Sequence, residues 1–589
     1  QRLKNNQTEE LAIRSYKGIQ KCSSRCCCSV KPVMTLNALL FLSHNEMCES
    51  EPCPRTKYLW VGTRPRAQRA GAYVPQRAKQ RCLDICSLLS IAPMSALLKS
   101  LPQHPSETEL GASQSQEIRS KTAASHHKLY ESLANQLPSE QQIDESADFI
   151  RKSLNTCEAD PDGLPFEPSE LFGWMERNIQ NVHGEYQRYL EQRKAGASRR
   201  YFANRSHAIY FLRQVAPTKL VDGSWLYGLC TYADNSRLSD LVLTYLEELG
   251  TGDADKNHVT LYRGLLSRYG IDSFDDLPDA LYEQGLIQLA LGWNAKDFLP
   301  EIVGFNLAYE QLPLHLLITA YELNELGIDP YYFTLHITVD NADTGHARRA
   351  CQAALDAAPR IDDGGDYWRR VRAGAKLGNI GISTVNVIES FDLDTEVVRI
   401  FSRKSTAGHG AHSDFCKIGG RKVNDWLSNP EDIPAFLETL EQAGWILKGR
   451  PPAESRFWNL LQGDRAEMFG VFSSYELQVI YDWIRGKSNV DGASFESTST
   501  PELAGTTTLP RRPISFRVAE RLKAAKGFTK HPISDEALDV DLSLMRDQLP
   551  RLSPVAQRKM LIEAMSPALH WTPAGLFATK RFLQSAAVH

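Results

Sequence analysis

The chain has 589 residues, a length that predicts about two to four domains. Its 67 lysines and arginines nearly balance 71 aspartates and glutamates, which gives a net charge of −4. This balance argues against a general binder of nucleic acids or membrane surfaces. No apolar run approaches the roughly 18 residues of a membrane span, so we expect a cytoplasmic protein with an ordinary hydrophobic core.

The first 145 residues show little regular periodicity. Residues 1–93 hold eight of the twelve cysteines, at spacings that match no zinc motif, and we expect an atypical extension that is disordered or non-native. Residues 94–145 are polar and rich in Gln, Ser and His, which predicts a leader to the folded part.

Helical periodicity dominates residues 146–380, whereas the Val, Ile and Thr alternation typical of strands is scarce. We therefore expect an all-α bundle in this range. The predicted helices cover 167–193, 206–214, 237–249, 277–291, 303–326 and 330–355.

The predicted helix over 237–249 ends at glycines, and Asn257-His258 opens the helix that follows. Glu248 lies among the apolar residues of its helix, which predicts a carboxylate directed at the core, whereas Glu247 points roughly opposite. Glu248 and His258 are therefore candidate metal ligands. Taken one at a time, a boundary position for Glu248 and a capping role for His258 are the commoner interpretations.

The predicted helix over 303–326 places Glu310 on its apolar face. Pro313 follows, removes a backbone donor and bends the helix nearby. A buried carboxylate is costly unless a cation or a metal pairs with it. Glu310 is therefore a candidate ligand, with an ion pair to Lys or Arg as the alternative, and Glu301 ranks second because it lies off the apolar face.

One short segment holds two imidazoles and two carboxylates. His336 and Asp340 are four residues apart and share a helix face, and Asp343 falls within an arc of about 60° with them. His346 is displaced by about 80° from His336 in a regular helix. Gly345 could let the backbone adjust, so Asp343 and His346 remain alternatives for the last ligand. A strand over the β-branched residues is a further alternative.

These candidates combine into one predicted metal centre. Mixed carboxylate and imidazole ligation inside a helical bundle is how di-iron and di-manganese sites are built, and these donor atoms suit iron, manganese or zinc. The predicted ligands are Glu248, His258, Glu310, His336, Asp340 and His346.

Residues 381–487 predict a second helical segment that packs on the bundle, with helices over 430–444 and 474–486. His409, His412, Asp414 and Cys416 occur there in a loop-like context without zinc spacing, which favours loop packing over a second metal site. Residues 488–589 predict a Ser/Thr/Pro-rich linker and a basic, mostly helical tail.

Several motifs resemble the iron-containing redox enzymes of the haem-oxygenase-like di-metal oxidase superfamily, and in particular its long bacterial branch. The likeness covers about residues 165–487. The motifs are Glu247-Glu248-Leu-Gly-x-Gly-x4-Asn257-His258, Phe298-Leu-Pro-Glu-Ile-Val-Gly304, His336-x3-Asp340, Gly408-His-Gly-Ala-His412-Ser-Asp, Ser455-Arg-Phe-Trp458, Met468-Phe-Gly-Val-Phe472 and Tyr481-Asp-Trp-Ile-Arg485.

The resemblance implies a haem-oxygenase-like helical bundle with a C-terminal helical extension that binds two Fe(II) ions in place of haem. It implies an enzyme that uses O2 to oxidise a small molecule such as an amino acid, an amine or a fatty acid. An electron donor and a second copy of the chain, as a homodimer, are the further expected partners. The sequence departs from the family signature His-x3-Asp-x2-His, because Asp343 stands where the second histidine is expected and His346 follows three residues later. For the first-helix carboxylate that the resemblance implies, Asp222 is another candidate.

Two other functions remain open from the residues alone. One is a haem-binding protein of the haem-oxygenase type, in which one histidine ligates haem and the carboxylates play no part. The other is a non-catalytic helical interaction protein, whose ionisable residues pair with each other.

Overall fold

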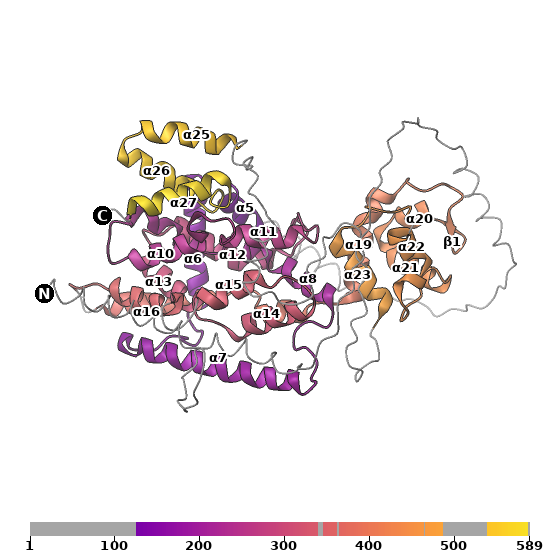
Figure 1. Cartoon of the computed structure of the whole chain (residues 1–589), viewed down its shortest axis with the longest axis horizontal. Coiled ribbons are helices and arrows are strands. Elements are labelled where there is room, and N and C mark those ends of the chain that lie inside the picture. Colours follow the sequence, from indigo (N-terminus) through magenta and orange to yellow (C-terminus); the bar gives the residue numbers. More distant parts are fainter. Residues whose placement is uncertain (1–124, 340–344, 362–363, 464–465, 487–538, 587–589) are drawn as a thin grey trace, which may run out of the picture. The chain divides into compact units, whose positions relative to one another are not determined.

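The computed structural model describes residues 125–339, 345–361, 364–463, 466–486 and 539–586 (Figure 1). Helices dominate these residues, which confirms the expected all-α fold. The strands β1 (Lys417–Ile418) and β2 (Arg421–Lys422) form a small antiparallel pair, with Lys417 opposite Lys422. In the described ranges, no helix combines the length and the apolar character that a membrane crossing requires.

The helices of the bundle lie between residues 126 and 376. They are α5 (His126–Ala134), α6 (Glu140–Thr156), α7 (Leu171–Lys194), α8 (Arg205–Gln214), α9 (Ala216–Lys219), α10 (Ser239–Glu248), α11 (His258–Ser267), α12 (Glu283–Trp293), α13 (Leu299–Tyr309), α14 (Leu314–Glu325), α15 (Tyr331–Val339), α16 (His346–Asp356) and α17 (Gly365–Lys376). Short 3-10 helices, among them η3 (Ser224–Tyr232) and η4 (Gly250–Gly252), connect some of them.

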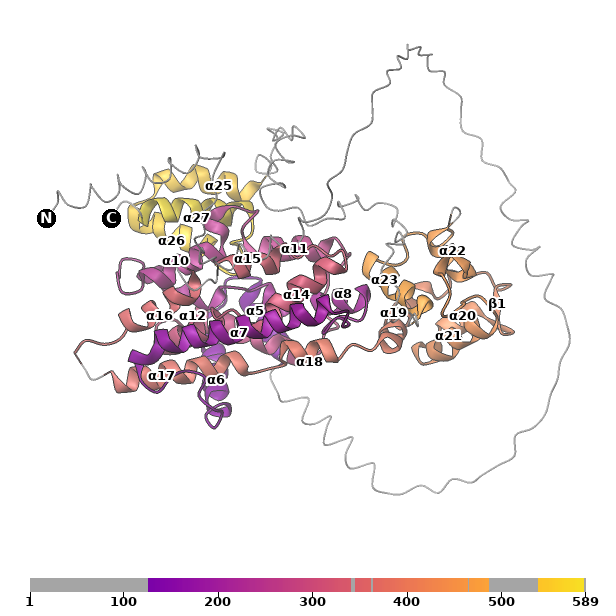
Figure 2. The ribbon, with the colours of Figure 1, turned by 60° about the horizontal axis from the view of Figure 1, so that its bottom comes forward.

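Two further sets of helices follow in sequence. The first set is α18 (Thr384–Glu389), α19 (Leu393–Gly408), α20 (Val423–Leu427), α21 (Ile433–Gln442), α22 (Arg456–Gln462) and α23 (Ser474–Arg485). The second set is α25 (Val540–Gln548), α26 (Pro554–Ala564) and α27 (Pro573–Ala586), which lie together in both views (Figures 1 and 2).

Side chains at the helix starts explain several of these boundaries. Ser139 and Gln142 form a capping box at the start of α6, and Ser473 and Glu476 form one at the start of α23. Each box satisfies backbone N–H groups that have no partner within the helix. Asn257 caps α11 by accepting from the N–H of Thr260 at 2.9 Å.

Two large apolar cores hold the helices together. One core combines residues of α6, α7, α10, α12, α13, α16 and α17 with residues of the three C-terminal helices, including Leu542, Met565 and Phe582. The other combines residues of α8, α11, α14 and α15 with residues of the 387–484 stretch. The basic tail therefore contributes buried side chains to the same core as the helices that carry Glu248 and His346.

Two predicted helices are each divided in the structure. The helix expected over 303–326 ends at Tyr309 as α13, and α14 begins at Leu314, because Pro313 has no N–H for a continuous helix. The helix expected over 330–355 is divided into α15 and α16, with Gly345 in an extended conformation before His346. The alternative of a strand around His336 is wrong, since residues 331–339 are helical.

Candidate metal centre

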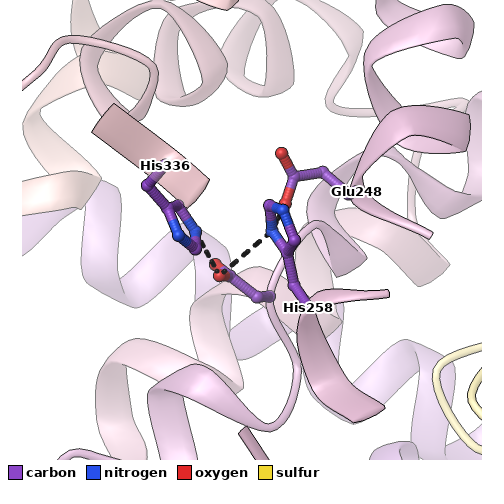
Figure 3. Close-up of side chains that lie close together, drawn as sticks. Glu248, His258 and His336 are labelled. Atoms are coloured by element: carbon purple, nitrogen blue, oxygen red, sulfur yellow. Dashed lines mark hydrogen bonds and ion pairs between the residues drawn. The ribbon is translucent and has the colours of Figure 1, made fainter. Parts of the chain in front are cut away.

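Asp222, Glu248, His258 and His336 form the first of two groups of possible ligand atoms, in which His336 is partly buried and the other three residues are buried. One oxygen or nitrogen atom from each residue lies within 4.8 Å of those from the others. Oδ2 of Asp222 lies 3.0 Å from Nε2 of His336 and 3.8 Å from Nδ1 of His258, and Glu248 contacts the same nitrogen of His258. Figure 3 shows both imidazoles directed at this carboxylate, with Glu248 beside His258. We call these four residues the Asp222 group.

Glu248, Glu310 and His346 form the second group, called here the His346 group. Nδ1 of His346 lies 3.0 Å from Oε2 of Glu310 and 3.4 Å from Oε1 of Glu248. All three side chains are buried. Because Glu248 belongs to both groups, one of its oxygens faces His258 and the other faces His346. A carboxylate placed in this way can bridge two metal ions.

The turn after α10 brings Glu248 and His258 together. Gly250, Thr251 and Gly252 all adopt positive φ values, of 64°, 51° and 81°. Glycine reaches this left-handed region without a steric penalty, whereas Thr251 pays one. The chain therefore reverses within a few residues, and the Asn257 cap starts α11 with His258 as its first helical residue.

Gly223 lets the loop that carries Asp222 approach α10. Its φ is +80°, and a Cβ atom there would lie 2.8 Å from Cβ of Glu248. A side chain at position 223 would therefore push the two carboxylate-bearing segments apart. The Asp222-Gly223 pair thus has a physical reason to occur next to the ligand cluster.

The two helix breaks place Glu310 and His346. Glu310 follows the last residue of α13, where Pro313 prevents the helix from continuing, and its side chain is buried. Gly345 precedes α16, so His346 is the first residue of a new helix and is not bound to the angular spacing of α15. In a regular helix His346 would be displaced by about 80° from His336 around the helix axis. This displacement does not apply here, because the two residues lie in different helices.

Outer hydrogen bonds orient two of the three imidazoles. Nδ1 of His336 lies 2.8 Å from the carbonyl oxygen of Tyr332, which can only accept, so Nδ1 carries the proton and Nε2 faces Asp222. Nε2 of His346 lies 2.8 Å from Glu247, which leaves Nδ1 facing Glu248 and Glu310. A ring N–H donated to a carbonyl or carboxylate is the usual support of a metal-binding histidine.

The buried carboxylates are held in the ionised form. Burial raises the pKa of Asp222, but the charge of Lys219 and the hydrogen bond with His336 outweigh it and lower the pKa to about 2. Burial also opposes ionisation of Glu248, yet His258 and His346 hold its pKa well below its usual range. For His336, burial lowers the pKa, but the bond to Asp222 dominates and raises it to about 9.

This donor set fits a metal ion. The ion-pair partners of Asp222 and Glu248 are imidazoles, which balance carboxylate charge only when protonated. Nδ1 of His258 is fully buried and has no hydrogen bond of acceptable geometry, although two carboxylates lie beside it. A divalent cation would satisfy that nitrogen and the carboxylate charges together.

Glu301 and the candidates of the downstream loop lie outside these groups. Asp340 and Asp343 are outside the described residues. Glu301 is buried but forms a two-pronged ion pair with Arg370, at 2.7 Å for both contacts, so its charge is already balanced. In the downstream loop, Nδ1 of His409 lies near a backbone carbonyl and Asp414 pairs with Lys422.

One further cluster of possible ligand atoms comprises His127, Glu131 and Asp275. Glu131 and Asp275 are exposed, and His127 stacks on Tyr282. An exposed acidic pair beside a histidine is common without any ion, so this cluster adds no site.

Two contributors were not recognised as such in the sequence. Glu247 was predicted to point away from the cluster, but it is half-buried and binds both His346 and Arg349. The hydroxyl group of Tyr332 donates a 2.6 Å hydrogen bond to Asp222. In the sequence, only its place one helical turn before His336 could have indicated this role. Asp222 itself was only an alternative, since no helix pattern placed it near Glu248.

An all-helical fold with two carboxylate–histidine groups that share a glutamate defines the class of helical proteins with a candidate metal centre. Residues 209–379, which include Asp222, Glu248, His258, Glu310, His336 and His346, match the model of the family described as iron-containing redox enzyme. This match confirms the resemblance found in the motifs, over that part of the chain. No curated protein and no solved structure matches the chain significantly.

Proposed function

We propose that this protein is a non-haem iron oxidoreductase that uses O2 to oxidise a small molecule at a di-iron site. The observation that carries the proposal is the position of Glu248 between His258 and His346. In this assignment Asp222, His258 and His336 would hold one iron, Glu310 and His346 would hold the other, and Glu248 would bridge them. The family match over residues 209–379 supports iron as the metal.

Bound iron would supply the electron-transfer chemistry with O2, which no protein side chain provides alone. The protein's own part is to hold ligands and protons in place. Tyr332 binds Asp222 through its hydroxyl group and His336 through its carbonyl group, so one residue orients two ligands. Glu247, itself paired with Arg349, keeps the His346 ring aimed at Glu248 and Glu310.

The positive charge of Lys219 near this site supports the proposal that the substrate is acidic. Its ammonium group lies 6.0 Å from the ring centre of Tyr309 and 5.9 Å from that of Tyr332, and its charge acts on Asp222, His336 and His315. Nearby His315 is neutral, because burial and then the charge of Lys219 lower its pKa to about 4. A carboxylate on the substrate would give Lys219 a direct partner.

The buried charge disfavours the haem alternative. A haem ring needs an apolar pocket and one axial ligand, whereas here three carboxylates surround the three imidazoles. Addition of haem is expected to produce no Soret band of a histidine-ligated complex. A stoichiometric Soret band that the His258→Ala variant loses would favour the haem-binding function instead.

The direct test is anaerobic titration of the metal-free chain with Fe(II), followed by exposure to O2. We expect about two irons per chain and O2 consumption that depends on them. A panel of fatty acids, amino acids and amines then identifies the compound that accelerates O2 consumption. Binding of fewer than about 0.2 irons per chain, unchanged in His336→Ala, would favour a helical interaction protein whose ionisable groups pair with each other.

A further inference from the structure

The turn between Glu248 and His258 is covered by a segment far away in the sequence. Residues 539–586 lie outside the family match over 209–379, yet their helices share a core with α10. The hydroxyl group of Tyr245, on α10, donates to the carbonyl oxygen of Met565 at 2.5 Å. Arg263, on α11, stacks over the ring of Trp571 at 4.0 Å. The connection between α26 and α27 therefore contacts α10 and α11, the helices that carry Glu248 and His258.

Asn257 connects the ligand-bearing turn to His570. Its Oδ1 accepts from the N–H of Thr260 at 2.9 Å, which caps the helix that begins with His258. Its Nδ2 lies 3.3 Å from the carbonyl oxygen of Leu249, the residue after Glu248, and 3.1 Å from Nδ1 of His570. One amide group thus joins the segments of both ligands to the C-terminal part of the chain.

The hydrogen-bond roles in this contact are determined by chemistry. An amide nitrogen can only donate, so Nδ1 of His570 must accept and the ring proton must lie on Nε2. Burial lowers the pKa of His570 to about 3, so the neutral ring is the form that is present. Asn257 is 0% exposed and His570 is 1% exposed, so water does not compete for this hydrogen bond.

α27 reinforces the same turn. Gly252 has a φ of +81°, and a Cβ atom there would meet the carbonyl oxygen of Leu576 and lie 2.6 Å from Cγ of Lys580. The backbone of the turn therefore touches the backbone of α27 directly. Such close approach leaves the turn little freedom to open while the helix remains in place.

We propose that His570 is a positioning residue for the metal centre. Through its hydrogen bond with Asn257, His570 holds Glu248 and His258 at their mutual distance. The inference rests on the proposed function insofar as the positioned side chains are metal ligands. It adds that the C-terminal helices, outside the family match, are part of the machinery of this site. Within the described residues, the hydrogen bonds of the His570 ring do not reach a candidate ligand directly, and the link to the ligand-bearing turn runs through Asn257.

The test compares three variants of the full-length chain. His570→Ala removes the Nδ1 acceptor and leaves only the backbone carbonyl oxygen, 3.5 Å from Nδ2 of Asn257, whereas His570→Asn restores an amide oxygen at about the place of Nδ1. Phe582→Leu is the matched control, because Phe582 is buried in the same C-terminal helices and its side chain has no hydrogen-bonding group. Each variant is titrated anaerobically with Co(II), whose visible absorption bands report the geometry of its ligands.

We expect His570→Ala to weaken Co(II) binding at least tenfold and to change the absorption bands, with His570→Asn restoring most of both. Phe582→Leu is expected to lower thermal stability while its Co(II) spectrum stays that of the parent chain. Unchanged affinity and spectrum in His570→Ala would overturn the inference, and so would an equal change in Phe582→Leu.

Amide hydrogen exchange of the metal-free chain separates this inference from the proposed function. His570→Ala is expected to accelerate exchange at residues 249–260, whereas Phe582→Leu is not. If the parent chain binds no metal at all, the proposed function fails, and the exchange result alone decides whether His570 holds the turn. Equal exchange rates in the parent chain and His570→Ala would overturn the role of His570 in that case too.

Discussion

Oδ2 of Asp222 and Nε2 of His336 lie 3.0 Å apart, although 114 residues separate them in the sequence. Asp222 is buried and His336 is partly buried, and the hydroxyl group of Tyr332 donates to the same Asp222 oxygen at 2.6 Å. In the metal-free chain this contact keeps a proton on His336, because the bond to Asp222 outweighs burial and raises the pKa to about 9. The proton beside Asp222 lies on Nε2, in addition to the one that Nδ1 donates to Tyr332. A metal ion must displace this Nε2 proton to use the nitrogen as a ligand.

Metal affinity should therefore rise with pH until His336 is neutral without metal. Below about pH 9 each binding event releases the His336 proton, so affinity increases by up to about tenfold per pH unit and then levels off. Calorimetric titration with Co(II) at pH 6.5 and pH 8.5, in buffers of different ionisation enthalpy, measures affinity and proton release together. Equal affinity at both pH values, without proton release, would contradict the assignment of His336 as a ligand.

Glu248 should be required for both metal ions, and Glu310 for only one. Glu248→Ala is expected to leave less than about one ion per chain, whereas Glu310→Ala leaves about one, held by the Asp222 group. Metal analysis after reconstitution gives these numbers. Equal loss of metal in the two variants would show that Glu248 does not have the special position argued here.

Glu301→Gln is the matched control for the loss of a buried glutamate. Its partner Arg370 loses a charged acceptor, so the free energy of unfolding should fall by about 3 to 5 kcal/mol at most. Its metal content should stay that of the parent chain. Denaturant unfolding and metal analysis on the same samples separate the two effects, and loss of metal would return Glu301 to the list of ligands.

Gly223→Ala should disturb the metal centre more than it disturbs the fold. The left-handed conformation costs an alanine about 1 to 2 kcal/mol, and the new Cβ would lie 2.8 Å from Cβ of Glu248. Gly196→Ala is the control, because Gly196 has a φ of +93° and nothing within 4 Å of an added Cβ. We expect a larger loss of thermal stability in Gly223→Ala, which adds the clash to the backbone cost, and weaker Co(II) binding only in that variant. Equal Co(II) affinities in the two variants would contradict this explanation.

Lys219→Met should reduce recognition of acidic compounds. Removing the ammonium group near Tyr309 and Tyr332 is expected to weaken binding of a carboxylate about tenfold or more, which corresponds to about 1.4 kcal/mol. The iron-loaded chain is titrated with fatty acids and with their amides while tryptophan fluorescence is followed. Lys376→Met, which removes a lysine paired with Asp162, is the control. Equal weakening for acids and amides would argue against a carboxylate partner for Lys219.

From the sequence we could predict the helical class, the burial of Glu248 and Glu310, and the candidate ligands His258, His336 and His346. Helical periodicity and the cost of burying a charge are local properties, so they can be recognised without knowing which segments meet. The bend near Pro313 was predicted for the same reason, although the structure shows a complete break that leaves Glu310 at the end of α13.

Two features could be seen only in the tertiary structure. They are the carboxylate that completes the Asp222 group and the residues that hold the imidazoles in place. Asp222 follows no helical pattern, and only the contact of Gly223 with α10 brings it beside Glu248. Glu247 lies on the side of its helix opposite the apolar stripe, yet α16 supplies His346 and Arg349 as its partners. His570 contacts Asn257, although 313 residues separate them in the sequence. Such contacts depend on how distant segments pack, which no local periodicity encodes.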